Sequence, residues 1–580
     1  MNRKENFIST YKFIDIFLKG YKGNLLLFFI SCFFDYFLYI ITPIIFGLML
    51  DQIVYYKNIS LFLSISSLII VFLFFYIFLY VHMYKQHDIL TTGFIMNVKK
   101  KAYEHLLESK SIYFINKKAG EIVTIVNQYS NDCLAFLIKD IIFNLNNLFN
   151  VIFCLAYIYI MNVQLGFLIS LLIPISVFFS TLLNKKINSL FNNNRVLKEK
   201  YDGRIFDLLA NFTEIKFLSG EKNAIKIFSF ENNKLLDNKL KVDTSINNLK
   251  ILYEGINLII QLIIYSLLAI FSYRNQLTIG MISVILIYFF DIGKCLSAIV
   301  HSNLVAQERI NNIHELKMFL HSESEKEYDG YDDIQITAGQ IDFCKVNFSY
   351  KKKADILKDL SLSMSPGERI AIVGESGSGK STLALLLLRF MEIQSGGIFI
   401  DNQDITKFSV KSLRRNIGIV QQQILVFPGT LRENITMGKM DVSDEKILDA
   451  CNRAGLNDFL RMQPEKLDTW ISDTENIFSG GQLQMLGIAR ICLEDPAILI
   501  FDEATRGLDK ISETKVLASW ENLTQNKTAI MITHKLSNTN YCDRVIVLKA
   551  GEIIETGAPN EVLIRSAELK KLFNTGGGYD

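Results

Sequence analysis

Apolar residues are distributed unevenly along the chain, and their pattern separates a first half from a second. Six apolar runs in the first half are each long enough, at about 20 residues, to cross roughly 30 Å of hydrocarbon as a helix. They occupy residues 24–50, 61–81, 141–161, 163–183, 256–273 and 280–300. The run at 61–81 contains no charged residue, which favours membrane-spanning helices over the alternative of a soluble helical repeat.

The connections between these runs alternate in length, and the long ones follow the second and fourth runs. Both long connections are basic, and they carry Lys99, Lys100, Lys101, Lys117, Lys118, Lys185, Lys186, Arg195, Lys198, Lys200 and Arg204. Because cytoplasmic loops are enriched in lysine and arginine, we expect both long connections and both chain ends to be cytoplasmic. Apolar residues at helical spacing between Ile205 and Ile215 predict helices that continue below the membrane.

The charged stretch HSESEKEYDGYDD, residues 321–333, ends the helical half. From about residue 340, short β-rich runs alternate with helical ones; they are IDFCKVNFSY, RIAIVG, GIFI, AILIFDE, TAIMIT, RVIVL and EIIETG. That alternation is typical of an α/β domain. The predicted fold class is an α-helical transmembrane domain with six long helices (1–320), joined by a linker (321–338) to an α/β domain (339–580).

Composition excludes some classes of protein and supports the membrane interpretation. Half of the residues are apolar and the mean hydropathy is +0.24, which is too hydrophobic for one soluble domain of 580 residues. The formal net charge is only +2, so no nucleic-acid partner is expected on grounds of bulk charge. The eight cysteines contain no CxxC pair and are interpreted as reduced structural thiols.

One short motif in the second half predicts a nucleotide. The sequence AIVGESGSGKST, residues 371–382, fits GxxxxGK[ST], in which backbone N–H groups ring phosphates at the start of a helix. Lys380 is expected to reach the β- and γ-phosphates, and Ser381 to hold Mg²⁺. The predicted ATP-binding residues of this loop are Gly374, Glu375, Ser376, Gly377, Ser378, Gly379, Lys380, Ser381 and Thr382.

A pair of acids follows another apolar run. In AILIFDEA, the side chains of Asp502 and Glu503 should diverge at the end of a strand, because successive strand residues point to opposite faces. Asp502 is expected to join the metal shell and Glu503 to activate the attacking water. Two solvated acids at a strand end are the alternative.

The stretch FSGGQ, Phe478 to Gln482, is similar to the signature of ATP-binding-cassette (ABC) proteins. By this resemblance Tyr350 stacks on adenine, Gln422 senses Mg²⁺ and the water, and His534 orients the γ-phosphate and the water. The expected catalytic residues are Glu503, His534 and Gln422, and the expected magnesium ligands are Ser381, Gln422 and Asp502. The resemblance also adds ATP contacts at Ser479, Gly480, Gly481, Gln482 and Asp509.

The resemblance covers the whole chain, which looks like a half-transporter of the type I exporter class. In that class two cassettes sandwich two ATP molecules, so a dimer is implied; we favour a homodimer over a heterodimer. Two short helices, around Phe114 to Ile122 and around Ala210 to Phe217, are expected to contact the cassettes. Four residues depart from the usual family pattern, at Glu475, Leu483, Met485 and Arg506.

The cargo is the least constrained feature. Asp35, Asp291 and Lys294 lie within predicted spans, where each charge costs about 2.5 to 3.5 kcal/mol, so they should face the interior and could line a substrate cavity. Asp291 and Lys294 could instead neutralise each other at i, i+3. We expect export of an amphipathic substrate across a bacterial plasma membrane, with a matured antimicrobial-type peptide favoured. A lipid or multidrug exporter is the alternative, and an ATP-gated channel or sensor is the alternative from another class.

Overall fold

The computed structural model describes residues 3–110, 119–274, 277–325, 331–350, 355–439, 441–472 and 478–565. The chain forms two compact units. The first contains Met1–Leu107 and Phe114–Ser322, and the second contains Glu108–Tyr113 and Glu323–Asp580. Ile334 is buried in the apolar core of the second unit, so the end of the predicted linker is part of that unit.

The first unit is helical. Its helices are α1 (Arg3–Asp15), α2 (Lys22–Val54), α3 (Ile59–Ile89), α4 (Ile95–Glu108), α6 (Ala119–Ala135), α7 (Phe143–Met161), α8 (Val163–Ala210), α9 (Phe212–Phe217), α10 (Glu221–Tyr273) and α11 (Ile279–Leu320). A 3₁₀ turn, η1 (Ile16–Leu18), and two π-helical segments, η2 (Leu90–Phe94) and η3 (Phe136–Ile142), interrupt the chain between them.

The six predicted spans all lie in helices. In the part of the chain that the structure describes, four helical segments are long and apolar enough to cross a membrane: Lys22–Val54, Ile59–Glu108, Gly120–Met161 and Ile279–Ile299. Leu258–Tyr273 is a shorter apolar segment of α10, and the run at 163–183 forms the first part of α8. The predicted helical transmembrane domain is therefore confirmed.

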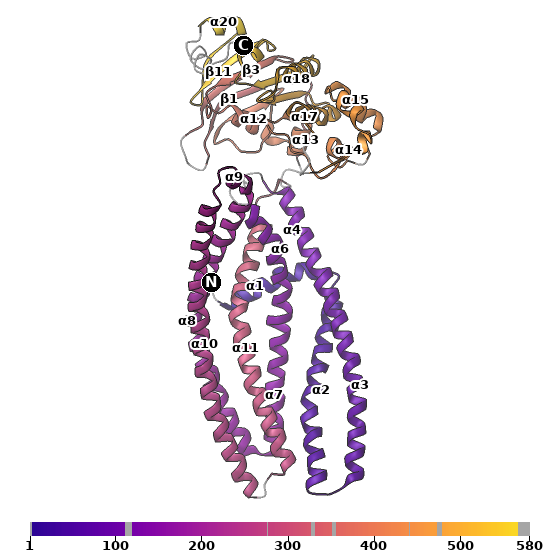
Figure 1. The fold of residues 1–580 in the computed structure, drawn as a ribbon, viewed down its shortest axis with the longest axis vertical. Coiled ribbons are helices and arrows are strands. Elements are labelled where there is room, and N and C mark those ends of the chain that lie inside the picture. Colours follow the sequence, from indigo (N-terminus) through magenta and orange to yellow (C-terminus); the bar gives the residue numbers. More distant parts are fainter. Residues whose placement is uncertain are drawn as a thin grey trace. The chain divides into compact units, whose positions relative to one another are not determined.

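Two helices are much longer than a bilayer is thick. α8 has 48 residues and α10 has 53, and at 1.5 Å per residue they span about 70 and 80 Å. They pack side by side, joined by the short helix α9 (Figure 1). Both helices are thus long enough to continue beyond a bilayer, and the short helix expected near Phe217 is present as α9. Of the other expected short helix, residues 114–118 lie outside the described residues.

The end of α2 packs closely against the start of α11. The Asp51 carboxylate accepts hydrogen bonds from the Thr278 hydroxyl (2.7 Å) and the Gly280 N–H (2.8 Å) at the start of α11. A Cβ on Gly280 would collide with the Gly47 carbonyl oxygen and lie 2.6 Å from Asp51 Cγ. The two glycines therefore permit a backbone approach that no larger residue allows.

The second unit is an α/β domain, as predicted. A six-stranded sheet has the order β12-β11-β3-β10-β9-β6, parallel except for β12. Its strands are β3 (Arg369–Gly374), β6 (Ile417–Val420), β9 (Ile498–Asp502), β10 (Thr528–Ile532), β11 (Arg544–Lys549) and β12 (Glu552–Gly557). An antiparallel sheet β2-β1-β4-β5 has strands β1 (Ile341–Phe348), β2 (Leu357–Met364), β4 (Ser395–Ile400) and β5 (Gln403–Asp404), and β7 (Gly429–Thr430) pairs with β8 (Trp470–Ile471).

Helices flank these sheets. They are α12 (Lys380–Leu387), α13 (Val410–Asn416), α14 (Leu431–Thr436), α15 (Asp444–Arg453), α16 (Asn457–Met462), α17 (Gly480–Glu494), α18 (Lys510–Leu523), α19 (Leu536–Thr539) and α20 (Pro559–Arg565), with 3₁₀ turns η5 (Ile405–Lys407) and η6 (Lys466–Asp468). The strands of a parallel sheet that is covered on both faces are continuous apolar runs. β10 is such a strand, because every one of its residues is buried.

The core of the second unit holds the strand that ends in the acid pair. Trp520 of α18 is fully buried and meets Phe501 of β9 edge to face, with ring centroids 4.8 Å apart. Phe501 immediately precedes Asp502, so the packing of this aromatic pair fixes where the strand ends.

Candidate active site

The predicted phosphate loop connects β3 to α12, and its glycines are required by its shape. Gly379 precedes α12 with φ 105°, a left-handed conformation in which side chains are strained. A Cβ there would also lie 2.7 Å from Leu357 Cδ2, and one on Gly374 would collide with the Leu548 carbonyl oxygen. The loop can therefore present backbone N–H groups only with glycine at these positions.

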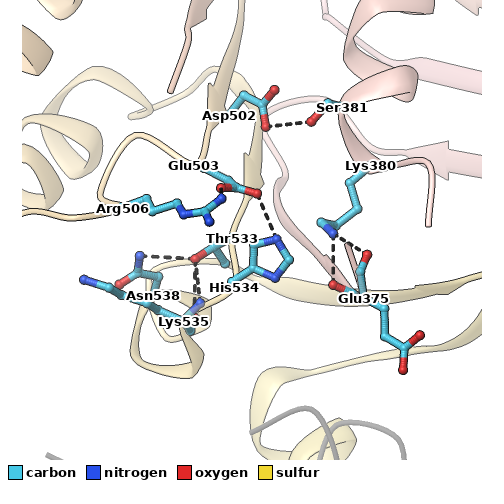
Figure 2. Close-up of polar contacts among 11 residues, drawn as sticks. Glu375, Lys380, Ser381, Asp502, Glu503, Arg506, Thr533, His534, Lys535 and Asn538 are labelled. Carbon is cyan, nitrogen blue, oxygen red and sulfur yellow. Dashed lines mark hydrogen bonds and ion pairs between the residues drawn. The ribbon is translucent and has the colours of Figure 1, made fainter. Parts of the chain in front are cut away.

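Lys380 lies inside this loop (Figure 2). Its Nζ donates to the carbonyl oxygens of Gly374 (2.9 Å) and Glu375 (2.8 Å), and the residue is only 5% exposed. Burial lowers the pKa of the Lys380 ammonium, and the carboxylates of Glu503 and Asp502 oppose that shift. The nearby Ser378 hydroxyl is buried without a hydrogen-bond partner among the described residues. A buried cation beside an unsatisfied donor suits a phosphate group.

Ser381 and Asp502 meet at the carboxyl ends of parallel strands. The Ser381 hydroxyl, at the start of α12, donates to Asp502 Oδ1 over 3.1 Å (Figure 2). Burial raises the pKa of the Asp502 carboxyl, and the hydrogen bond from Ser381 lowers it. A hydroxyl oxygen beside a carboxylate matches the hard oxygen ligands that Mg²⁺ prefers, so these two residues fit a magnesium site.

Glu503 has both carboxylate oxygens occupied. His534 Nε2 lies 2.8 Å from Oε1, and Arg506 Nη1 donates to Oε2 over 2.7 Å (Figure 2). The backbone of Glu503 has φ 52°, which is rare outside glycine, and its N–H donates to the Ile532 carbonyl. The side chain has other partners than Asp502, as predicted, but the left-handed backbone of Glu503 directs it, because β9 ends at Asp502.

A hydrogen-bond network holds the segment that carries His534. Thr533 Oγ1 accepts from the Lys535 N–H (3.0 Å) and from Asn538 Nδ2 (3.3 Å), and Asn538 also donates to Thr505 Oγ1 (2.7 Å). Burial is the largest cause that lowers the pKa of His534, and the charge of Lys380 lowers this pKa further. The carboxylate of Glu503 opposes both effects. The imidazole is therefore neutral near pH 7, and its Nε2 carries the hydrogen that faces Glu503.

The signature residues begin α17. The Ser479 hydroxyl accepts from the Gln482 N–H (3.3 Å), and the Gln482 side chain accepts from the Ser479 N–H (2.8 Å), which forms a capping box. Because Ser479 Oγ is the acceptor in this cap, its own hydrogen remains available to donate. A Cβ on Gly481 would lie 2.5 Å from Ser512 Cβ, so a glycine is needed for α17 to approach α18.

Other predicted residues lie outside this cluster. Asp509 caps α18 by accepting from the Ser512 N–H (3.2 Å), and Tyr350 meets Phe348 edge to face. The Gln422 carbonyl accepts from Gln484 Nε2 (2.8 Å), whereas its side chain is exposed. In the described part of the chain, no hydrogen bond joins the Gln422 side chain to Asp502 or Ser381.

The sequence analysis does not identify two polar residues of the site, Thr533 and Asn538, or the pairing of Arg506 with Glu503. Arg506 was noted only as a departure from the family pattern. Its position three residues after Glu503 is a signal for an i, i+3 contact, although the turn between them was not predicted. Thr533 and Asn538 carry no local signal, because their role depends on the turn after β10.

The charged residues of the predicted spans lie in the first unit. Asp291 is 5% exposed and accepts a hydrogen bond from the Tyr39 hydroxyl (3.1 Å). Lys294 Nζ lies 4.0 Å from Asp291 Oδ1, but its side chain is 76% exposed within the unit. Asp35 Oδ1 is buried without a hydrogen-bond partner among the described residues. Asp291 thus faces α2, and its pairing with Lys294, which the sequence left as an alternative, is present as a long contact.

Comparison with known proteins agrees with this arrangement. Two family models match, the ABC transporter transmembrane region over residues 25–292 and the ABC transporter model over residues 357–506. The putative multidrug export ATP-binding/permease proteins of Staphylococcus aureus strains NCTC 8325, COL and Mu50 are each 28% identical to this chain over 489 residues. The match covers 83% of this chain and 83% of each relative.

A solved structure shares the fold. A bacterial Atm1-family ABC exporter with ATP bound matches with a TM-score of 0.83 and 22% identity, over 97% of this chain and 99% of that chain. Both units therefore occur in one chain in the same order as in known exporters. The chain belongs to the ABC transporter family, as a half-transporter of the type I exporter class: a multi-pass protein of the bacterial plasma membrane whose cytoplasmic domain hydrolyses ATP to drive export.

Proposed function

We propose that two copies of this chain form a homodimer that exports an amphipathic compound of the lipid or drug-like type. The observation that carries this proposal is the contact between Glu503 and His534 beside the Ser381–Asp502 pair. The same chain also carries the capped signature at Ser479. Two identical chains can therefore supply two complete ATP sites, each built from the phosphate loop of one copy and the signature of the other.

The proposed chemistry follows from the positions of these side chains. The phosphate loop and Lys380 hold the β- and γ-phosphates, while Ser381 and Asp502, with Gln422, hold Mg²⁺. When bound, Mg²⁺ neutralises charge that develops on the phosphate oxygens. Glu503 accepts a proton from water as the water oxygen bonds to the γ-phosphorus and the bond to the ADP oxygen breaks. His534 orients Glu503 and the water.

The remaining predicted contacts belong to the same proposal. Tyr350 stacks on adenine, and Asp509 and the glycines of the signature complete the interface between the two copies. Tyr350, Gly480 and Asp509 are exposed or half-buried in one chain, which suits groups that a nucleotide and a partner copy would cover, whereas Gly481 is buried against α18. Closure of the two cassettes would draw the long helices together and open the opposite face of the membrane domain.

The proposed cargo class comes from the relatives and from polar groups of the membrane unit. The relatives are named putative multidrug export proteins, which supports a lipid-like or drug-like compound; they give no support to the peptide favoured by the sequence alone. Asp35, Asp291 and Lys294, with the hydroxyl of Tyr39, would provide a few polar groups in an otherwise apolar route. The intact Glu503 and His534 favour repeated hydrolysis, and so a pump rather than an ATP-gated channel.

The proposal is tested by ATP hydrolysis of the purified chain in lipid vesicles, with lipids, dyes and peptides added in turn. We expect stimulation by one class of amphipathic compound, abolished in Glu503→Gln. Asp291→Asn should weaken stimulation while leaving basal hydrolysis unchanged, because it lies in the membrane unit. An absence of hydrolysis by the chain alone would contradict the homodimer, and stimulation only by peptides would contradict the cargo class.

A further inference from the structure

Arg506 occupies an oxygen that the proposed reaction needs. The inference rests on the proposed role of Glu503 as the base. A carboxylate accepts a proton from water only if one oxygen has a lone pair directed at that water. In the structure Oε1 faces His534 and Oε2 faces Arg506 (Figure 2). Each carboxylate oxygen has two lone pairs and so keeps one after these contacts, but each contact takes a lone pair that could otherwise accept the proton.

The exposed fractions of the side chains indicate which of the two Glu503 contacts opens more easily. The Glu503 side chain is 12% exposed, that of His534 is 38% exposed and that of Arg506 is 63% exposed. Solvent competes most strongly for the most exposed partner, so the Arg506 pair is the weaker of the two. The segment of His534 is also held by Thr533 and Asn538, whereas the guanidinium of Arg506 has no other hydrogen bond to a described residue.

The backbone directs Arg506 towards Glu503. The Arg506 N–H donates to the Glu503 carbonyl over 3.0 Å, which closes a turn. Glu503 and Gly507 have φ 52° and 74°, so left-handed residues bracket this turn. The Thr505 side chain, within the turn, is fixed by Asn538. The anchored turn therefore positions Arg506 beside the Glu503 carboxylate. Only the Arg506 side chain has to move for the ion pair to break.

We propose that Arg506 is an autoinhibitory positioning residue, which pairs with Glu503 Oε2 and restrains hydrolysis until its side chain moves away. The pair holds the carboxylate in place against His534 and takes one lone pair of Oε2 that could otherwise accept a proton from water. Assembly of the complete site, or an incoming phosphate that attracts the guanidinium, would release it. Such a contact would limit ATP consumption by a transporter that has no cargo.

The test is the basal ATP turnover of the full chain in lipid vesicles without cargo. An exposed ion pair changes an equilibrium by at most about fivefold. Arg506→Ala should therefore raise kcat about two- to fivefold and leave the KM for ATP unchanged. Arg506→Gln, which keeps most of the side-chain length, should have the same effect, and Arg506→Lys should lie between. Arg461→Ala removes another exposed arginine of the same domain and should change nothing.

Salt gives a second readout that a purely structural role would not produce. Raising ionic strength shortens the screening length, from about 10 Å at 0.1 M to about 3 Å at 1 M, and weakens exposed pairs. The ATP turnover of wild type and Arg461→Ala should rise with salt, because both proteins keep the Arg506–Glu503 pair. The turnover of Arg506→Ala and Arg506→Gln should rise less. Equal salt profiles, or turnover in either Arg506 variant at or below wild type, would overturn the inference.

The double variant Glu503→Gln, Arg506→Ala separates this inference from the proposed function. It should be inactive, because the additional turnover passes through Glu503. If Glu503→Gln alone hydrolyses ATP like wild type, the proposed role of Glu503 fails. If Glu503→Gln is inactive but Arg506→Ala shows no gain, only the autoinhibitory role of Arg506 fails.

Discussion

The Ser381 hydroxyl donates to Asp502 Oδ1 over 3.1 Å, although 121 residues separate them in the chain. Ser381 follows β3 and Asp502 ends β9, and β10 lies between these two strands in the sheet. Because all three strands are parallel, their carboxyl ends meet at one edge, where ligands bind in open α/β sheets. The phosphate loop, the two acids and His534 come together at that edge.

The first prediction concerns the Ser381–Asp502 pair. Asp502→Asn removes the negative charge of the proposed magnesium ligand, so magnesium-dependent hydrolysis should fall at least about 100-fold. Removing Mg²⁺ from the wild type with EDTA should have the same effect, and both are measured as phosphate release. Asp495→Asn, at an exposed ion pair just before β9, is the control and should retain hydrolysis. Magnesium-dependent turnover that survives in Asp502→Asn would exclude the assigned ligand.

The second prediction concerns the support of His534. Asn538→Ala leaves the hydroxyls of Thr505 and Thr533 without this buried donor, at a cost of about 1–3 kcal/mol in the free energy of unfolding. We expect kcat to fall about tenfold with the KM for ATP unchanged, which is less than the roughly 100- to 10,000-fold that an acid–base group contributes, because His534 is displaced but still present. Thermal unfolding and steady-state kinetics measure the two effects. A stability loss with normal kcat would show that the network does not position His534.

The third prediction concerns the contact of α2 with α11. Gly280→Ala places a Cβ against the Gly47 carbonyl and the Asp51 carboxylate, and should lower the free energy of unfolding by about 1–3 kcal/mol. Gly293→Ala, on the same helix, has no atom within 4 Å of its Cβ and should be neutral or slightly stabilising. Thermal unfolding in detergent compares the two variants. Equal melting temperatures would mean that the helices separate at this point.

The fourth prediction concerns pH. Two hydrogen bonds from the Arg369 guanidinium hold the pKa of Asp543 below its usual range. A depressed carboxyl pKa adds stability above the unfolded value near 4, and that stability is lost as pH falls through the folded value. Asp543→Asn should therefore destabilise the chain at pH 7, by about 1 kcal/mol or less because the pair is exposed. The difference from wild type should shrink between pH 5 and 3 in thermal unfolding, and a constant difference would refute the assignment.

The sequence predicts what local patterns encode. The phosphate loop is one continuous motif, and the apolar runs define the spans, so both were identified without coordinates. Five strands were missed: β5, β7 and β8 have two residues each, β6 has only four, and β2 (LKDLSLSM) has a lysine and an aspartate near its start. The sequence predicted separate partners for Asp502 and Glu503 from the alternation of strand side chains; in the structure β9 ends at Asp502, and a left-handed turn at Glu503 separates them instead.

Contacts across the chain could not be predicted in the same way. The Asp51 carboxylate caps α11 from 227 residues away, and nothing near Asp51 indicates that partner. The pairing of Arg506 with Glu503 depends on a left-handed glutamate, which sequence propensities disfavour. Such features depend on tertiary packing that overrides local preference.

The central claim, that this chain alone pumps an amphipathic compound at the cost of ATP, is tested most directly by transport itself. Mg-ATP would be added outside inside-out vesicles that contain only this purified chain. The entry of a fluorescent amphipathic dye or lipid into the vesicles would then be followed. The account predicts ATP-dependent accumulation with wild type and none with Glu503→Gln. Equal entry with both proteins, or no entry with any dye or lipid that stimulates hydrolysis, would contradict it.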